Sequence, residues 1–334
     1  MRKMASRALV LVFAVSLRLS GAPPRFEKVS DHYYCYQCKS DGLNVGAVVS
    51  DDGILLINPP GEPELTEALD ALKRISTRPV RWVVSTDYRI ALAGGPARLA
   101  EQGALIVGSD AMRPLLARGA KAGTDAQSEA KSDQPEPRPD MARLSIAFGK
   151  QMRLFPDGLE VRIFGLQHTA RTAADVAVFI PAEKVVQMGD LYNLGSYPEI
   201  DEDQGGSADG WIDGIKQVVD AVPLLKPAIP PPKIPPSSKT ASSKSAASAK
   251  GAPAVEKTPE EEVTVVTGHG PLSNLMELKG LLETSRKLRA EVSKLVAGGV
   301  ERENFLSSPG LSSFRVYNGF DQYATQLFDA LSKK

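Results

Sequence analysis

The stretch LEVRIFGLQHTARTAADVAVFIPAEKVVQMGD, residues 159–190, holds three short apolar runs in succession. The runs cover 159–164, 175–180 and 184–188, and each contains the β-branched residues that favour strands. Pro181-Ala182-Glu183 separates the last two runs and predicts a turn between them. The stretch therefore predicts three neighbouring strands of one sheet.

Similar runs on either side of this stretch alternate with helical patterns. Residues 45–50 and 54–57 flank Asp51-Asp52-Gly53, and an Asp-Gly step between two apolar runs predicts a hairpin. Leu65, Leu69, Leu72 and Ile75 then have the spacing of one helix face. Further strands are expected at 80–85, 104–107, 144–148, 151–154 and 262–267. Further helices are expected near 98 and at 110–117, 211–222, 275–295 and 314–331. The alternation predicts an α/β sandwich.

Composition and charge narrow the class of protein. The chain has 334 residues, of which 42% are apolar and 24% charged, close to the average for soluble globular proteins. Lys plus Arg and Asp plus Glu each number 40, so the net charge is zero. A protein that binds nucleic acid or an anionic membrane needs a basic excess. We therefore expect a small molecule or a protein as partner, no nucleic acid, and no membrane span beyond a signal sequence.

The amino terminus has the form of an export signal. Arg2, Lys3 and Arg7 precede an apolar run over 8–17, which is shorter than the about 20 residues that span a bilayer. Small residues at 20–22 offer a cleavage site, so residues 1–22 are predicted to be a signal peptide. The alternative is a buried first helix or strand. Export predicts a periplasmic or secreted protein.

Cys35 and Cys38 are the only cysteines. In an oxidising compartment they would most simply form a local disulfide. The other interpretations are two unbridged thiols, or a metal site that takes His32 as a further ligand.

Two segments lack the composition of a core. Residues 120–140 are rich in Lys, Asp, Ser, Ala and Pro, and they predict a solvated loop. Residues 226–259 contain eight prolines with much Ser, Ala and Lys, and they predict a disordered insertion. The rest, 23–334, is expected to form one domain. An alternative hypothesis makes the insertion the working part, as a tether to a polymer or a protein.

Three polar residues lie where chemistry is expected. His168, Asp190 and His269 each follow a predicted strand within a glycine-containing turn. Ligand sites in α/β proteins gather at such strand ends. Two His and one Asp from three strand ends have the chemistry of a zinc site. The alternative is that each His is a hydrogen-bonded structural residue and that Asp190 caps a turn.

The sequence resembles the metallo-β-lactamase fold superfamily from about Asn44 to the carboxyl terminus. The hairpin over 44–57 is similar to the first hairpin of that family, and Gly165-Leu166-Gln167-His168-Thr169 is similar to its Gly-x-x-His-Thr motif. Met188-Gly189-Asp190, with the residues at 197–207, resembles a periplasmic hydrolase branch whose Asp bridges two zinc ions. Thr267-Gly268-His269-Gly270-Pro271 resembles the motif of the last His ligand. The resemblance implies a four-layer αββα sandwich.

One motif of the family is missing. The family carries Thr-His-x-His-x-Asp-His and then Gly-Gly directly after the strand expected at 80–85. Here Thr86 and Gly94-Gly95 fix the register. Between them Asp87 and Arg89 stand where the first two His belong, and Ala91 and Leu92 replace the Asp and the last His. Asn58 replaces the Asp that closes the second strand in the family.

The missing ligands change the expected function. The resemblance implies zinc ligation by His168, Asp190 and His269, with Asp87 as a substitute oxygen ligand, but Ala91 and Leu92 cannot ligate. Arg89 brings a fixed positive charge toward this pocket and is expected to pair with Asp190 or Asp87 in place of a metal. We therefore expect a non-catalytic binding protein without a cofactor. The alternative is a hydrolase with one zinc ion on Asp87, His168, Asp190 and His269.

Overall fold

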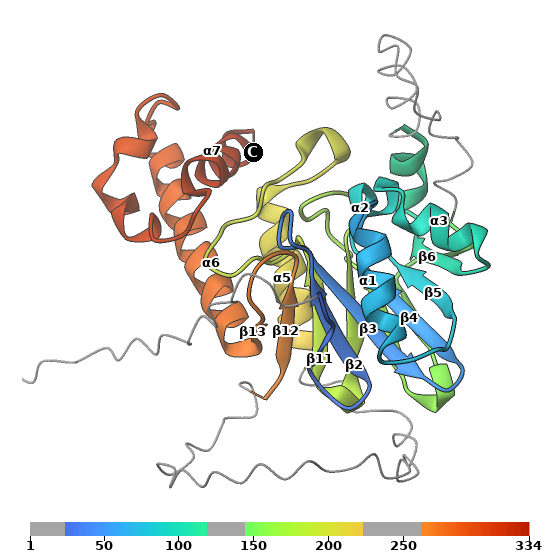
Figure 1. Cartoon of the computed structure of the whole chain (residues 1–334). Helices are drawn as coiled ribbons and strands as arrows, with labels where there is room; N and C mark the ends of the chain where they lie inside the picture. The colour runs from blue at the N-terminus through green and yellow to red at the C-terminus, as the bar shows by residue number, and fades with distance from the viewer. Residues whose placement is uncertain (1–23, 119–143, 223–261, 334) are drawn as a thin grey trace, which may run out of the picture.

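The apolar runs form two sheets in a computed structural model that describes residues 24–118, 144–222 and 262–333 (Figure 1). The predicted signal peptide at 1–22, the loop at 120–140 and the insertion at 226–259 lie outside the described residues, so these three remain predictions. No helix in the described ranges is both long and apolar enough to cross a membrane.

The first sheet has seven strands in the order of the sequence, β1-β2-β3-β4-β5-β6-β7. Neighbours from β1 to β4 are antiparallel, and those from β4 to β7 are parallel. The predicted hairpin is confirmed, because Ser50 pairs with Gly53 across its turn. The strands are β1 Glu27–Lys28, β2 Tyr33–Gln37, β3 Asn44–Ser50, β4 Gly53–Ile57, β5 Val80–Val84, β6 Leu105–Ser109 and β7 Ile146–Phe148.

The second sheet has six strands in the order β13-β12-β11-β10-β9-β8. All neighbours are antiparallel except β11 and β12, which are parallel. The stretch 159–190 provides β9, β10 and β11 side by side, as predicted, with a 3-10 turn at Pro181–Glu183. The strands are β8 Gln151–Leu154, β9 Val161–Gly165, β10 Val176–Ile180, β11 Val185–Gly189, β12 Thr264–Thr267 and β13 Ser273–Asn274.

Helices lie on the outer faces of the two sheets (Figure 1). They are α1 Glu64–Lys73, α2 Tyr88–Leu92, α3 Gly95–Glu101, α5 Ala208–Ala221, α6 Leu275–Ala297 and α7 Phe320–Ser332, and residues 112–118 are also helical. The prediction of one helix over 314–331 was wrong at its start. Pro309–Phe314 form 3-10 turns. The helix α7 begins only after Gly319, where a positive φ of 74° interrupts the helical backbone.

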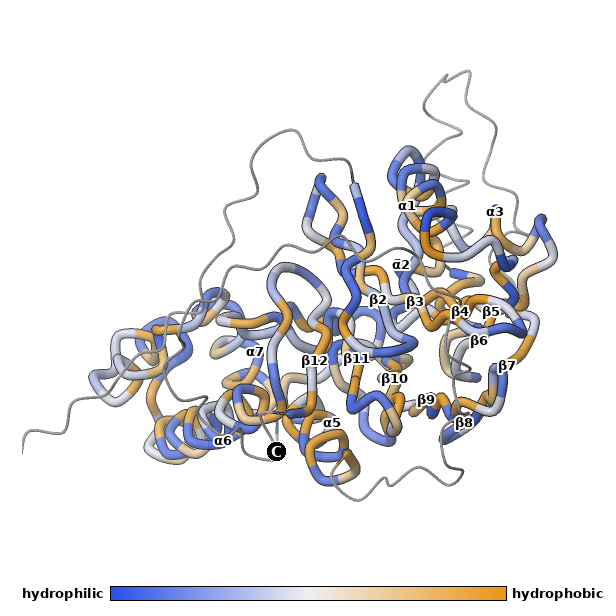
Figure 2. Tube along the Cα trace, turned by 60° about the horizontal axis from the view of Figure 1, so that its bottom comes forward, coloured by the Kyte–Doolittle hydropathy of each residue, from blue (hydrophilic) through white to orange (hydrophobic). Residues whose placement is uncertain are grey.

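Three apolar clusters separate the four layers. Leu55 and Ile57 of β4 face Val176 and Val178 of β10 in the cluster between the sheets. The alternate residues of the same strands face outward: Ile54 and Leu56 pack beneath α1, and Ala177 and Phe179 pack beneath α5, α6 and α7. Because both faces of these strands are buried, their sequences are continuous apolar runs. Figure 2 shows hydrophobic residues along the strands and mixed colours along α6, which has one exposed face.

Polar contacts fix the two sheets to each other. The Tyr33 hydroxyl donates to Gln187 Oε1 at 2.8 Å, and Gln187 Nε2 donates to the Asn44 carbonyl at 3.0 Å. Tyr33 and Gln187 are both fully buried. At the same end of the sandwich, Leu43 and His269 form an isolated bridge. These contacts bring the end of β12 close to the loop between β2 and β3.

Candidate functional site

Four chain segments meet at one end of the two sheets. Asp87 follows β5, Arg171 lies between β9 and β10, Asp190 follows β11 and His269 follows β12. Each segment leaves its strand and turns there, so the side chains face a common region. Their contacts form one chain of charges that runs from Asp87 through Arg171 and Asp190 to His269.

Asp87 is 1% exposed and caps the short helix α2. Its Oδ1 accepts a hydrogen bond from the Arg89 backbone N–H at 2.6 Å, as an N-cap residue does. Its Oδ2 accepts a hydrogen bond from Arg171 Nη1. The carboxylate is thereby satisfied on both oxygens by groups of this chain.

Arg171 is the cation at the centre of the site. It is 4% exposed, and its guanidinium contacts Asp87 through Nη1 and Asp190 Oδ2 through Nη2, the latter at 3.4 Å. The loop that carries it is fixed by Asp175, which accepts hydrogen bonds from the Thr172 N–H at 2.7 Å and the Thr172 hydroxyl at 3.0 Å. The Arg171 carbonyl accepts the Asp201 N–H at 2.9 Å. These contacts fix the backbone at 171 and 172, and the loop therefore holds the guanidinium between Asp87 and Asp190.

His269 forms the other end of the chain of charges. Its Nδ1 lies 2.9 Å from Asp190 Oδ1, and its Nε2 lies 3.7 Å from Asp41 Oδ2. The His269 backbone N–H donates to Asn193 Oδ1 at 2.8 Å. The imidazole is thus fixed between two carboxylates, while about a third of its surface remains exposed.

Two glycines allow the strand ends to approach this closely. A Cβ on Gly189, whose φ is +55°, would lie 1.9 Å from the Thr86 hydroxyl. A Cβ on Gly268 would lie 2.4 Å from Asp190 Oδ1 and 2.7 Å from the Asp190 nitrogen. A side chain at 268 would push Asp190 away from its partners, and a side chain at 189 would collide with Thr86 and Asn58. The glycines before Asp190 and His269 therefore serve the packing of the site.

Burial and charge shift the pKa of the acids in opposite directions. Burial raises the pKa of Asp87 to about 7 despite the neighbouring Arg171. Burial raises the pKa of Asp175 to about 7 as well, and the nearby Asp87 adds to the effect. Burial also acts on Asp190, but His269 and Arg171 together hold its pKa below the usual value. Hydrogen bonding to Asp190 raises the pKa of His269.

The structure separates His168 from this chain of charges and places Arg89 at its edge. His168 is exposed, and within the described residues it makes no hydrogen bond or ion pair with the other candidates. The loop from 166 to 175 turns Arg171 inward instead. Arg89 pairs with Asp87, one of the two acids expected for it, but it is not the cation at the centre of the site. Arg89 Nε reaches Asp87 Oδ1 only at 3.7 Å, and 39% of its side chain is exposed. Arg171 takes that position.

The predicted disulfide is not formed. Cys35 and Cys38 are both reduced. Cys35 belongs to the cluster between the sheets, whereas Cys38 belongs to the cluster beneath α1. The two side chains lie in different layers, so the short spacing does not bring the sulfur atoms together.

The zinc centre implied by the resemblance does not fit these residues. Among the described residues, the sole group of three or more His, Cys, Asp or Glu with mutually close ligand atoms is Cys38, Asp41 and Glu64. Asp87, His168, Asp190 and His269 do not form such a group. A guanidinium lies between Asp87 and Asp190, and the Ala91 and Leu92 side chains offer no ligand atom. Asn58, in place of an Asp, joins β4 to β5 through Thr86.

An open groove of about 700 Å³ lies beside the site. Tyr88 of α2 forms one link to it, because its hydroxyl donates to Asp201 Oδ2 at 2.9 Å. Acidic side chains outnumber basic ones along its wall: Glu199, Asp201, Glu202, Asp203, Asp321 and Asp329 against Arg89 and Arg302. The groove wall therefore carries an excess of acidic side chains, of which Asp329 pairs with Arg302 and Asp321 with Arg315.

Comparison with solved structures decides the fold. A metallo-beta-lactamase from Pontibacter korlensis aligns over 79% of this chain and 99% of its own, with a TM-score of 0.50 and 16% identity. This chain has the metallo-β-lactamase fold. The same fold relates it to TMB-1, with a TM-score of 0.52 and 15% identity over 80% of this chain and 98% of that one.

The stereoselective inverting sec-alkylsulfatase Pisa1 from Pseudomonas sp. also shares the metallo-β-lactamase fold. It aligns over 92% of this chain with a TM-score of 0.61 and 13% identity, and this chain spans 50% of it. No family model matches the sequence. No curated protein matches it either. Since the identities are this low, the alignments establish the fold and not the activity.

Sequence reasoning missed Arg171, Asp41 and Glu64. Arg171 stands three residues after His168 in the same loop, so a basic residue at a strand end was the available signal. Asp41 stands three residues after Cys38, a spacing that brings two side chains to one turn. Glu64 had no sequence signal beyond its place in the first turn of a predicted helix.

Proposed function

We propose that this chain is a non-catalytic relative of the zinc hydrolases that share its fold, without a metal at the strand ends, and that it acts as a binding protein. The single observation that carries the proposal is the Arg171 guanidinium between Asp87 and Asp190. Arg cannot lose its proton in a protein, so the positive charge is permanent. It neutralises the two acids that would otherwise attract a metal.

Hydrolases with this fold depend on the positive charge of bound zinc, and in this chain the Arg171 guanidinium takes the place of that charge. A bound zinc ion lowers the pKa of its water from about 16 to about 7 and polarises the group under attack. A guanidinium already hydrogen-bonded to two acids does neither. The only histidine of the site, His269, is held between Asp190 and Asp41. General acid–base catalysis by one such group contributes about 10²–10⁴-fold, well short of hydrolase rates.

The groove beside α2 is the proposed binding surface. It is open, holds about 700 Å³, and borders the site through Arg89 and Asp201. Its acidic excess favours a ligand with a positive charge. Within the described ranges Arg89 Nη2 has no hydrogen-bond partner, and 39% of the Arg89 side chain is exposed, so it is available to an acceptor on the ligand. This arrangement supports binding without requiring a reaction.

Zinc content measured on variants tests the proposal. We would equilibrate the full chain with zinc, dialyse it, and count bound metal by mass spectrometry beside Asp190→Asn and His269→Gln. We expect these two substitutions to leave the zinc content unchanged. Zinc that is lost from both variants would instead support the mononuclear hydrolase on Asp87, His168, Asp190 and His269. A screen of ester, lactam and phosphoester substrates would then follow.

We also propose that the protein is exported, from the basic and apolar pattern of residues 1–22. The mass of the intact protein, taken from a periplasmic or culture fraction, tests this. We expect a chain that lacks the first 22 residues. A full-length chain in the cytosolic fraction would contradict export and leave the binding proposal unaffected.

A further inference from the structure

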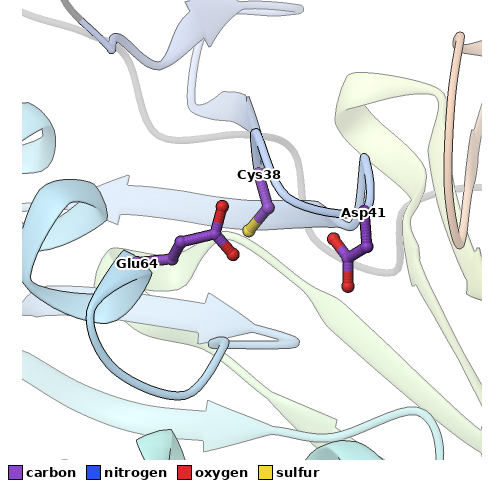
Figure 3. Close-up of side chains that lie close together, drawn as sticks. All are labelled: Cys38, Asp41 and Glu64. Carbon is purple, nitrogen blue, oxygen red and sulfur yellow. The ribbon is translucent and has the colours of Figure 1, made fainter.

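A second group of ligand atoms lies away from the charges around Arg171. Cys38 follows β2, Asp41 lies in the turn before β3, and Glu64 begins α1. Figure 3 shows the Cys38 sulfur between the two carboxylates. The sulfur and one oxygen from each acid all lie within 4.8 Å of one another. Cys38 is buried, Glu64 half-buried and Asp41 exposed, so the group is open to solvent on one side.

The chain holds these three side chains in place through the turn over 38–43. The Cys38 N–H donates to the Leu43 carbonyl at 2.9 Å, and the Gly42 N–H donates to the Cys38 carbonyl at 3.1 Å. Asp41 Oδ1 accepts the Leu43 N–H at 2.9 Å. The turn therefore directs Cys38 and Asp41 to the same side before any ligand binds.

Glu64 fixes the same turn from the helix. Its Oε1 accepts the Lys39 N–H at 2.8 Å and the Ser40 N–H at 2.9 Å, and its Oε2 accepts the Ser40 hydroxyl at 2.8 Å. These bonds place the carboxylate against the Cys38 thiol. Carboxylate oxygens can accept several such bonds and still ligate a cation.

The Cys38 thiol is polar, buried and directed into the group. It is 2% exposed, and within the described ranges the Glu64 carboxylate is its only hydrogen-bond partner. The nearby Lys39 ammonium binds Glu67 at 2.9 Å and does not neutralise the group. A thiol between two acids therefore lacks the cation that would balance them.

We propose that Cys38, Asp41 and Glu64 bind one zinc ion. Zinc accepts a thiolate with carboxylates, and three protein ligands leave one position for water. On binding, the Cys38 S–H bond breaks, the sulfur keeps the electron pair as a thiolate ligand, and the proton passes to solvent. Ligand atoms around a tetrahedral zinc lie roughly 3.3–3.8 Å apart at ordinary bond lengths. The group must contract by at most about 1.5 Å, which the exposed Asp41 side chain allows.

The site is separate from the one in the proposed function. It shares no residue with Asp87, Arg171, Asp190 or His269, although Asp41 lies 3.7 Å from His269 Nε2. A chain that binds zinc here would still carry a guanidinium in place of the hydrolase metal. Substitutions therefore decide which site holds any zinc that is found.

Cobalt supplies the most direct test, because a thiolate bound to Co²⁺ gives an intense charge-transfer absorption in the near ultraviolet. The full chain is loaded with Co²⁺ under reducing conditions, and zinc affinity is then measured by competition. We expect the thiolate band in the unmodified chain and its loss in Cys38→Ala. Zinc affinity should fall by more than about 100-fold, since changes around a ligand alone cost about 10–100-fold.

Three further variants complete the test. Cys35→Ala removes the other thiol and should keep the band. Asp41→Asn changes an exposed ligand without disturbing the core, and we expect it to bind zinc more weakly. Its zinc affinity can be measured even if Cys38→Ala fails to fold. His269→Gln should keep the band as well. A band that is absent from the unmodified chain, kept in Cys38→Ala, or lost in Cys35→Ala would overturn the proposal. Zinc that is lost only in His269→Gln would overturn the proposed function instead.

Discussion

A single guanidinium can replace a metal charge in this site because of its shape. Arg171 presents separate N–H groups to Asp87 and Asp190, and both acids are largely buried. A Lys ammonium is a point charge on a flexible stem and cannot span two acids in the same way. The geometry therefore depends on Arg in particular.

Removal of Arg171 should be costly. In Arg171→Ala, Asp87 and Asp190 lose their shared cation inside the protein, and loss of one partner from a buried pair costs about 3–5 kcal/mol. Urea unfolding at pH 8 measures the change. Arg89→Ala is the matched control, because Arg89 is 39% exposed and its contact with Asp87 is long. We expect the control to cost under about 1 kcal/mol. Equal losses in the two variants would contradict the central role of Arg171.

His269 should titrate above the usual range for histidine. Asp190 raises the pKa of His269, so the stability gained from protonated His269 is fully present below pH about 6.5 and is lost as pH rises through the raised value. The pKa of Asp190 is lowered, so its share is lost only in strong acid. Asp190→Asn should therefore cost more stability at pH 6 than at pH 9.

Two measurements check the His269 prediction, both with a chelator present. NMR titration follows the imidazole, whose pKa should fall in Asp190→Asn. Urea unfolding at pH 6 and pH 9 gives the stability of the same variant. His168→Gln serves as control and should leave the His269 titration unchanged. A stability loss in Asp190→Asn that is independent of pH would show that His269 and Asp190 are not coupled.

The site is built from strand ends whose backbones lie close together and are joined by hydrogen bonds. Gly268 follows β12, and its N–H donates to the Tyr192 carbonyl at 3.1 Å while its own carbonyl accepts the Asn44 N–H at 2.8 Å. The β12 end is therefore tied both to the segment after β11 and to β3 of the other sheet. A side chain at 268 would separate these segments.

Gly268→Ala should destabilise the fold by about 1–3 kcal/mol, the cost of an added group in a packed region. It should also lower the pKa of His269, because Asp190 would have to move. Gly280→Ala is the matched control. Gly280 lies on α6, is exposed, and has no atom within 4 Å of an added Cβ. We expect the control to stabilise the fold by about 0.5–1 kcal/mol. Thermal unfolding measures the change in stability, and titration of His269 measures the change in its pKa.

The elements were largely predictable from local pattern. The hairpin rests on Asp51-Asp52-Gly53, and the buried strands are continuous apolar runs, so neither depends on distant contacts. The last helix was misplaced because apolar residues continue from Phe314 through the break at Gly319. Pattern alone does not distinguish a helix from a 3-10 turn followed by a break.

The site was less predictable, because its contacts join residues far apart in the sequence. Asp190 and His269 were placed correctly, since each follows a recognisable strand. The direction of the loop over 166–175 was not predictable. It depends on Asp87, 84 residues away, and on the Asp201 backbone, and these contacts turn Arg171 inward and His168 outward. The residue spacing within the loop does not determine which of the two side chains points inward.

At the scale of the whole molecule, the acidic groove should favour cationic ligands. We expect a small polyamine, used as a probe in calorimetry, to bind more weakly as salt rises, because screening weakens exposed charges. Glu199→Gln with Asp203→Asn should lower the affinity about fivefold, at about 0.5 kcal/mol for each exposed charge.

The control for the groove changes the same net charge elsewhere. Glu101→Gln with Asp213→Asn removes two exposed acids that do not line the groove. We expect this pair to leave polyamine binding nearly unchanged. Equal weakening by the two double variants would indicate attraction to the whole molecule, and the groove would then have no specific role.

Arg171 also restricts the evolutionary routes by which a sequence of this kind can gain a metal at the strand ends. Replacing Arg171 first leaves Asp87 and Asp190 without a cation, whereas adding ligand side chains at 91 and 92 first leaves in place a guanidinium that repels the ion. The first change costs stability, and the second brings no metal while Arg171 remains. Natural sequences that keep a basic residue at 171 should therefore also lack metal ligands at 91 and 92, and the two changes should occur together across lineages.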